Sequence, residues 1–166
     1  MKLNSLEKLF VHKLKELHNA ERQLLLAIPK MAEVATNSEL KIAFETHLTE
    51  TKNQVKRLNA IFRDLSIRPG GYRCATMAGL IQECGDMCQA AADEQVSDAG
   101  LIACAQRIEH YEIAAYGTII ALAEKLDRHG AAATLRISLE EERENDSDLT
   151  DLAHSIINSP ALLAAR

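Results

Sequence analysis

Four long stretches of this sequence repeat apolar side chains at spacings of three and four, which is the period of a helix with one buried face. They span residues 4–35, 37–66, 97–127 and 130–158. Glycine (7) and proline (3) are scarce among the 166 residues, and aromatic residues make up only 4%. This composition disfavours tight turns and strand pairing, so we expect an all-α chain.

The connections between these stretches indicate how the helices are arranged. Residues 36–38 and 128–130 are short connections, so each joins two helices into an antiparallel hairpin. Arg68-Pro69-Gly70-Gly71 ends the second stretch, and a weaker helical pattern near residues 76–92 occupies the crossover. Two hairpins joined by one long crossover form a four-helix bundle of the ferritin-like arrangement. We expect one such domain over residues 1–166, with a short fifth helix in the crossover.

Helix starts can be assigned from residues that cap free backbone amides. Asn4 or Ser5 is the expected cap of the first helix, and Ser97 or Asp98 that of the third. Pro29 removes a backbone hydrogen bond inside the first helix, so we expect a kink there.

Charge and hydropathy exclude several classes of function. The net charge of −5 argues against nonspecific binding to nucleic acid, which requires clustered cations. No apolar run approaches the roughly 18 residues of a membrane span, and no secretory signal is visible. We therefore expect a cytoplasmic protein with no membrane or nucleic-acid partner. Its four cysteines are then most simply free thiols.

Acidic side chains and one histidine occupy the centres of the buried faces, where leucine would be usual. They are Glu21 in the first stretch, His47 and Glu50 in the second, Glu109 and Glu112 in the third, and Glu142 in the fourth. Each lies near the middle of its helix, so antiparallel packing brings them to one level. Buried carboxylates repel one another unless cations compensate them, and a pair of divalent metal ions is the simplest compensation. Oxygen ligands with one imidazole suit iron or manganese, and less specifically magnesium or calcium.

The sequence leaves more than one role for some of the side chains next to these positions. Tyr116 follows Glu112 by one turn and is expected in the core, with its hydroxyl reaching the carboxylates. Asp146 is either a ligand or a partner of a ligand. His110 points away from the buried face and is expected at the surface or behind a ligand. Any one of these acids, taken alone, is more often a solvated side chain than a ligand.

The residues around these positions resemble a known family. The segments are Ala20-Glu21, His47-Leu48-Thr49-Glu50-Thr51, the stretch from Ile108 to Gly117, Leu139-Glu140-Glu141-Glu142, and residues 149–153. Together they resemble the bacterial stress-associated YciF/YciE proteins of the ferritin-like superfamily, over nearly the whole chain. The resemblance implies a ferritin-like bundle, usually dimeric, with a rubrerythrin-like di-metal site.

The sequence departs from the usual superfamily pattern, in which two helices carry Glu-x-x-His. Here the order is reversed as His47-x-x-Glu50, and Asn145 stands where a second histidine would be. These departures make oxygen activation less expected than metal binding itself.

Two classes of function follow. The first is a di-metal carboxylate protein that holds two divalent ions per chain, iron before manganese, with redox activity at the metals as its reaction. The alternative is a non-enzymatic helical structural or interaction protein with a vestigial or non-redox metal site. A homodimer is also expected, because residues 76–92 carry more apolar side chains than a solvated connection needs. Its interface would use this segment or the exposed side of the first two helices.

Overall fold

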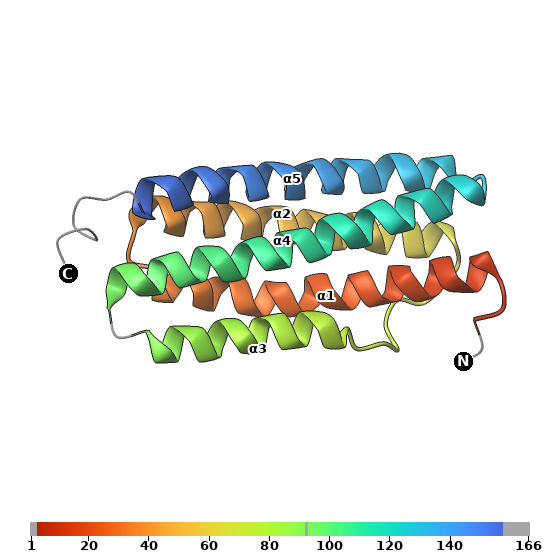
Figure 1. Ribbon diagram of the computed structural model, residues 1–166. Helices are drawn as coiled ribbons and strands as arrows, with labels where there is room; N and C mark the ends of the chain where they lie inside the picture. The colour runs from red at the N-terminus through yellow and green to blue at the C-terminus, as the bar shows by residue number, and fades with distance from the viewer. Residues whose placement is uncertain (1–2, 92, 158–166) are drawn as a thin grey trace.

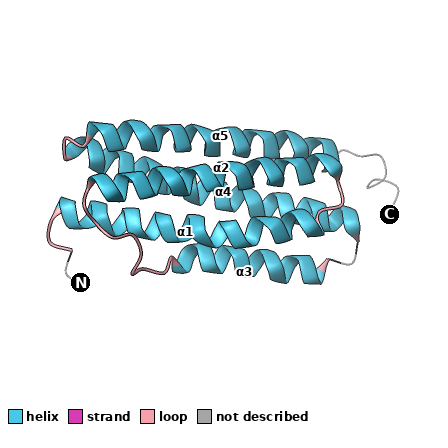
Figure 2. Ribbon diagram, turned by 180° about the vertical axis from the view of Figure 1, so that it is seen from behind, coloured by secondary structure: helices cyan, strands magenta, loops and turns pink. Residues whose placement is uncertain are grey.

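The computed structural model describes residues 3–91 and 93–157, and this part of the chain contains five helices and no strand (Figures 1 and 2). The helices are α1 (Leu6–Val34), α2 (Ser38–Asp64), α3 (Ala75–Ala90), α4 (Glu94–Lys125) and α5 (His129–Ile157). The all-α prediction is thereby confirmed. None of these helices is both long and apolar enough to cross a membrane.

The helices form two antiparallel hairpins that pack into one bundle (Figure 1). Helices α1 and α2 form the first hairpin and α4 and α5 the second, while α2 packs on α5 and α1 on α4. Helix α3 lies outside this bundle against α1 and α4, on the side away from α5 (Figures 1 and 2). The expected long crossover with its own helix is therefore present. The helix spans residues 75–90, whereas the sequence pattern indicated residues 76–92. The expected end of the last helix near residue 158 lies outside the described residues.

The expected cap of the first helix is confirmed, and α2 is capped by the same kind of contact. The Ser5 hydroxyl accepts a hydrogen bond from the backbone N–H of Lys8, and the Asn37 side chain accepts from the N–H groups of Glu39 and Leu40. Pro29 lies inside α1, and the kink expected there stays a prediction.

The expected cap of the third long helix is wrong. Helix α4 begins at Glu94, and the Asp93 side chain accepts from the first N–H groups. Asp98 is instead buried and reaches across to the turn between α1 and α2. Its carboxylate accepts from the N–H groups of Thr36 and Asn37, both at 2.8 Å, and from the Thr36 hydroxyl at 2.6 Å. Asp98 thus ties α4 to the first hairpin, which is a tertiary role.

The apolar core is divided into two clusters by a polar layer. One cluster is built around Leu24, Phe44 and Leu101. The other contains Phe10 and Phe62 and lies toward the opposite ends of the same helices. On α1, α2, α4 and α5 alike, the sequence between the two clusters supplies buried polar side chains, which are Glu21, His47, Thr51, Gln54, Glu109, Glu112 and Glu142. The carboxylates therefore lie at one level of the bundle, as their positions in the sequence predicted.

The apolar face of α3 is covered within the chain. Met77 and Cys84 are buried, and Leu80, Ile81 and Met87 pack against the same cluster. Because α1 and α4 already cover this face, it does not need a second copy of the chain to bury it, and the homodimer stays a prediction.

Candidate metal centre

Four side chains of the types that can bind a metal ion meet in the polar layer. They are His47 from α2, Glu109 and Glu112 from α4, and Glu142 from α5. One ligand atom from each lies within 4.8 Å of the others. The three glutamates have no exposed surface and His47 is 5% exposed. The i, i+3 spacing of Glu109 and Glu112 places both on the same face of α4.

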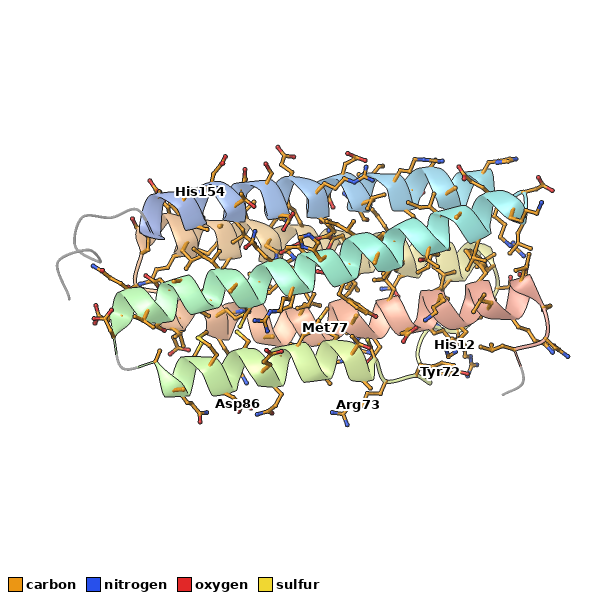
Figure 3. All side chains as sticks on the ribbon, viewed as in Figure 1. His12, Tyr72, Arg73, Met77, Asp86 and His154 are labelled. Carbon is orange, nitrogen blue, oxygen red and sulfur yellow. The ribbon has the colours of Figure 1, made fainter. Side chains whose placement is uncertain are left out.

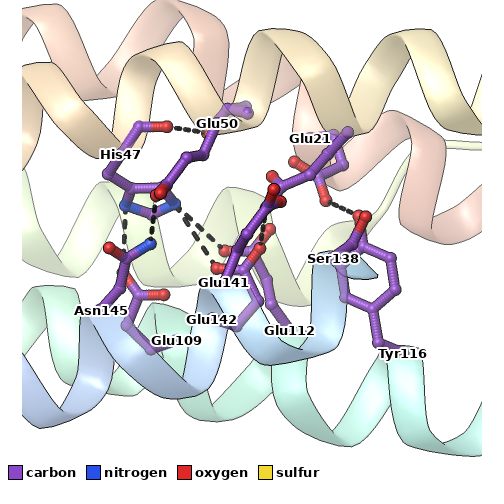
Figure 4. Close-up of polar contacts among 12 residues, drawn as sticks. Glu21, His47, Glu50, Glu109, Glu112, Tyr116, Ser138, Glu141, Glu142 and Asn145 are labelled. Atoms are coloured by element: carbon purple, nitrogen blue, oxygen red, sulfur yellow. Dashed lines mark hydrogen bonds and ion pairs between the residues drawn. The ribbon is translucent and has the colours of Figure 1, made fainter. Parts of the chain in front are cut away.

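The imidazole of His47 lies between the carboxylates (Figure 4). Its Nδ1 is 3.0 Å from Glu109 Oε1, within hydrogen-bond distance. Its Nε2 is 3.8 Å from Glu112 Oε2 and 3.7 Å from Glu142 Oε2, which is too far for a hydrogen bond. Two atoms that bind one metal ion at about 2.1 Å each lie roughly 3–4 Å apart. The separations around Nε2 are therefore those of a shared ion.

Glu21 approaches the same layer from α1. It is fully buried, and its Oε1 accepts a hydrogen bond from the Tyr116 hydroxyl at 2.5 Å. It also contacts Glu112. The expectation that the Tyr116 phenol reaches the carboxylates is confirmed (Figure 4).

Glu50 lies beside the cluster and is only half-buried. Its Oε2 accepts from the side-chain amide of Asn145 at 2.9 Å. Asn145 thus binds a carboxylate across the contact between α5 and α2. His110 is exposed, and its Nδ1 lies 3.3 Å from Asp146 Oδ1, so this pair lies outside the cluster.

A second layer of polar contacts, which was not predicted from the sequence, lies behind Glu142. The fully buried Gln54 donates to Glu142 Oε1 and, at 3.1 Å, to Glu141 Oε2. Arg57 binds both oxygens of Glu141, at 2.6 and 2.7 Å, and also contacts Ser138. The sequence could have indicated Gln54, because this residue follows His47 by seven positions and therefore lies on the same face of α2.

Burial and mutual repulsion raise the proton affinity of the carboxyl groups. Burial raises the pKa of Glu21 from 4.5 to about 7, against the hydrogen bond from Tyr116. Burial, and then the neighbouring carboxylates, raise the pKa values of Glu112 and Glu142 well above 4.5. Burial lowers the pKa of His47, but Glu109 and other carboxylates raise it by more, so the net shift is upward. Without a metal ion, the cluster therefore retains protons at neutral pH.

Several oxygens of this cluster have no hydrogen-bond donor among the described residues. They are Glu21 Oε2, Glu109 Oε2, both oxygens of Glu112, and Glu142 Oε2. No lysine or arginine of the described chain forms an ion pair with these four glutamates. Buried acceptors without donors or cations are costly. Divalent ions would satisfy this set, so the residues fit a metal site.

A cavity leads to the cluster from the surface between α2 and α5. It has a volume of about 420 Å³, and His47 and Glu109 lie among its lining residues. Glu39, Asp148 and Asp151 also line it, so the approach to the cluster is acidic. Such a lining raises the local concentration of cations.

Comparison with known proteins supports the fold and the family. The chain matches the family described as Domain of unknown function (DUF892) over residues 5–162. It is 40% identical to Protein YciF of Escherichia coli (strain K12) over 162 residues, which cover 97% of this chain and 98% of that protein.

Solved structures agree with this assignment. The crystal structure of the E. coli stress protein YciF aligns with a TM-score of 0.91 at 39% identity, over 95% of this chain and 99% of that chain. YcfI from Rhodopseudomonas palustris aligns with a TM-score of 0.88 at 40% identity, over 90% of this chain and 95% of that one.

A more distant structure shows the fold class. A two-domain protein from Anabaena variabilis with DJ-1/ThiJ/PfpI-like and ferritin-like domains aligns with a TM-score of 0.64 at 18% identity, over 94% of this chain and 39% of that one. The five-helix fold is thus ferritin-like, and the chain belongs to the DUF892 family as a relative of the stress protein YciF.

Proposed function

We propose that this protein is a stress-associated di-metal carboxylate protein that binds two divalent ions per chain, with iron expected before manganese. The proposed ligands are Glu21, His47, Glu50, Glu109, Glu112 and Glu142. The observation that carries the proposal is the set of buried carboxylate oxygens that have neither donor nor cation among the described residues. Stress association is extended from YciF, which is described as a stress protein.

Each proposed ligand would have its own role in metal binding. Glu21 and Glu109 would bind as terminal ligands from α1 and α4, and Glu142 as a bridge. Glu50 is the second candidate bridge, and it would have to turn further into the layer to take part, because it is half-buried beside the cluster. His47 and Glu112 complete the set.

Iron or manganese in this site would supply one-electron redox chemistry. The chain's own residues hold the carboxylates in place. Tyr116 donates to Glu21, and Gln54 donates to Glu142. The apolar clusters enclose the layer on two sides, and the cavity between α2 and α5 is its approach from the surface.

The non-enzymatic alternative has one observation in its favour. On the α2–α5 side, the cluster has only one histidine among the described residues. The carboxylate beside it, Glu50, is half-buried and already accepts a hydrogen bond from Asn145. This arrangement suits a metal that stabilises the bundle without reacting. Redox turnover of bound iron with peroxide, measured by its absorbance, separates the two functions.

Metal analysis of protein purified without chelator tests the binding itself. We expect about two equivalents of iron or manganese per chain, and a melting temperature that rises with either ion and falls again with chelator. A content far below one equivalent, with no effect of added ion on melting, would remove the proposal and leave the structural alternative.

The homodimer remains a prediction, and the exposed side of the first two helices is its remaining candidate surface. Leu26 on α1 and Ile42 on α2 stay 72% and 61% exposed. We propose that the exposed side of the first hairpin joins two copies. A monomer mass in light scattering at micromolar concentration would contradict this.

A further inference from the structure

Three of the four cysteines meet where α3 packs on α4, away from the carboxylate layer. Cys84 and Cys88 lie one turn apart on α3, and Cys104 lies on α4. Cys84 and Cys104 are buried in the same apolar cluster, and the half-buried Cys88 packs against it. The proposed metal centre uses none of them.

The two buried thiols are in contact. The Cys84 thiol donates a hydrogen bond to Cys104 Sγ. The helices approach closely here: a Cβ atom added to Gly100, one turn before Cys104, would collide with the Met87 side chain. Next to the thiols, the guanidinium of Arg107 forms an ion pair with Glu83, which also joins α4 to α3.

The surroundings make the two thiols unequal. The hydrogen bond that Cys84 donates, together with the positive charge of Arg107, lowers the pKa of Cys104 from 9.0 to about 7 against the effect of burial. The same hydrogen bond raises the pKa of Cys84. Cys104 is therefore partly a thiolate at neutral pH and can accept the Cys84 proton.

A surface cavity gives access to Cys84, the member of this pair that lies on α3. It has a volume of about 590 Å³, and both Cys84 and Cys88 lie among its lining residues. The charged side chains that line it are Lys30 from α1 and Arg73, which precedes α3 (Figure 3), and no carboxylate lines it. Gln23, Gln82 and Gln89 add amide groups. In a protein of net charge −5, this lining favours a small anionic molecule with polar amide groups.

We propose that Cys84 and Cys104 form a redox-active dithiol that small anionic disulfides oxidise through this cavity. Cys84 gives its proton to Cys104, and its sulfur attacks one sulfur of the external disulfide. That disulfide bond breaks, and the first small thiolate leaves. Cys104 then attacks Cys84 Sγ and displaces the second small thiolate. The one proton of the pair, held by Cys104 after the transfer, leaves on a released small thiolate when Cys104 attacks. One protein thiol, one protein thiolate and one small disulfide thus become one protein disulfide, one small thiol and one small thiolate.

Thiol counting on the full chain tests the proposal, with oxidised glutathione as the probe. We expect the number of free thiols in the subsequently denatured protein to fall from four to two, and excess reduced glutathione to restore it. Mass spectrometry of the non-reduced digest should identify a Cys84–Cys104 linkage. Four remaining thiols, or a linkage between other cysteines, would overturn the proposal.

Two variants distinguish the roles of the cysteines. Cys104→Ser should lose the internal linkage and accumulate a glutathione adduct on Cys84, whereas an adduct on Cys88 alone would overturn the assignment. Cys74→Ser is the matched control, because Cys74 caps α3 and serine caps helices well. It should still form the Cys84–Cys104 linkage. Far-ultraviolet circular dichroism checks that each variant is folded.

The cavity route has its own test. The double variant Lys30→Glu with Arg73→Glu should slow oxidation by glutathione disulfide about three- to tenfold, because the lining becomes acidic. The rate with neutral 2-hydroxyethyl disulfide should stay unchanged. An equal effect on both probes, or none on either, would show that the oxidant does not enter by this cavity.

Discussion

The Tyr116 hydroxyl donates a hydrogen bond of 2.5 Å to Glu21 Oε1, and both side chains are fully buried. This contact joins α4 to α1 at the edge of the carboxylate layer. It favours the ionised form of Glu21, and so it opposes the rise in the pKa of Glu21 that burial causes. Tyr116 thereby supports the charge that a metal ion would require.

Replacing Tyr116 with phenylalanine should therefore destabilise the metal-free protein at pH 8. The expected loss is about 1–3 kcal/mol of unfolding free energy, because a buried carboxylate loses its donor. Urea unfolding in the presence of chelator measures it. Tyr111→Phe is the matched control on the same helix, since the Tyr111 hydroxyl contacts Cys74 Sγ at 3.0 Å instead of a carboxylate. An equal loss for both variants would contradict a special role for the Glu21 contact.

The stability of the metal-free protein should fall as pH rises above about 4.5. The folded-state pKa of Glu21 is about 7, and those of Glu112 and Glu142 are also raised, while the unfolded chain loses the same protons near pH 4.5. Between these values the folded state binds more protons than the unfolded state. Each such group then contributes a decrease of about 1.4 kcal/mol per pH unit.

Urea unfolding at pH 5, 6, 7 and 8 in chelator checks this prediction. The upward pKa shift of His47 has the same sign, because its stabilising effect is also lost as pH rises through the folded-state value. Saturating metal should reverse the trend, since metal binding releases the protons and strengthens with pH. Stability that rises from pH 5 to 8 in the metal-free protein would be inconsistent with a protonated carboxylate cluster.

Much of the fold could be predicted because it depends on local signals. The apolar period marks four long helices, and Ser5 and Asn37 cap them as their side-chain chemistry requires. The start of α4 could not be predicted in the same way. Asp93 and Asp98 are equally good caps locally, and only the tertiary contact of Asp98 with Thr36 and Asn37 decides between them.

The buried side chains of the candidate site could be predicted as far as the period of a helix fixes the direction in which each side chain points. At 3.6 residues per turn, Glu50 points about 60° away from His47 around α2, whereas Thr51 and Gln54 point within about 40° of it. The structure accordingly buries Thr51 and Gln54 and leaves Glu50 half-buried. Contacts between helices, such as that of Gln54 with Glu142, depend on how α2 packs against α5. The spacing of residues along one helix does not reveal how that helix packs against another.

Gln54→Leu should weaken metal binding about 10–100-fold, the usual effect of losing a hydrogen bond to a metal ligand. Gln54 donates to Glu142, and leucine fills a similar volume without a donor. Titration calorimetry with manganous ion measures the affinity. Gln82→Leu on the exposed side of α3 is the control and should bind as the unmodified chain does. Unchanged affinity in Gln54→Leu would mean that Glu142 is not a ligand.

Glu109→Gln tests the metal centre most directly, because the amide keeps the shape of the side chain and removes its charge. An ion at 100 times its dissociation constant stabilises the folded state by about 2.7 kcal/mol, which corresponds to about 5–10 °C in melting temperature for a chain of this size. Glu109→Gln should lose most of that metal-dependent rise. In chelator it should be at least as stable as the unmodified chain, because one repulsive charge leaves the cluster.

Glu140→Gln is the matched control for this experiment. Glu140 lies on α5 two residues before Glu142, but it is exposed and pairs only with Arg143 among the described residues. Its replacement should leave both the metal-free melting temperature and the metal-dependent rise unchanged. The buried and the exposed glutamate therefore make opposite predictions for the same chemical change. An identical response of the two variants to ferrous and manganous ions would show that the buried carboxylates are not metal ligands.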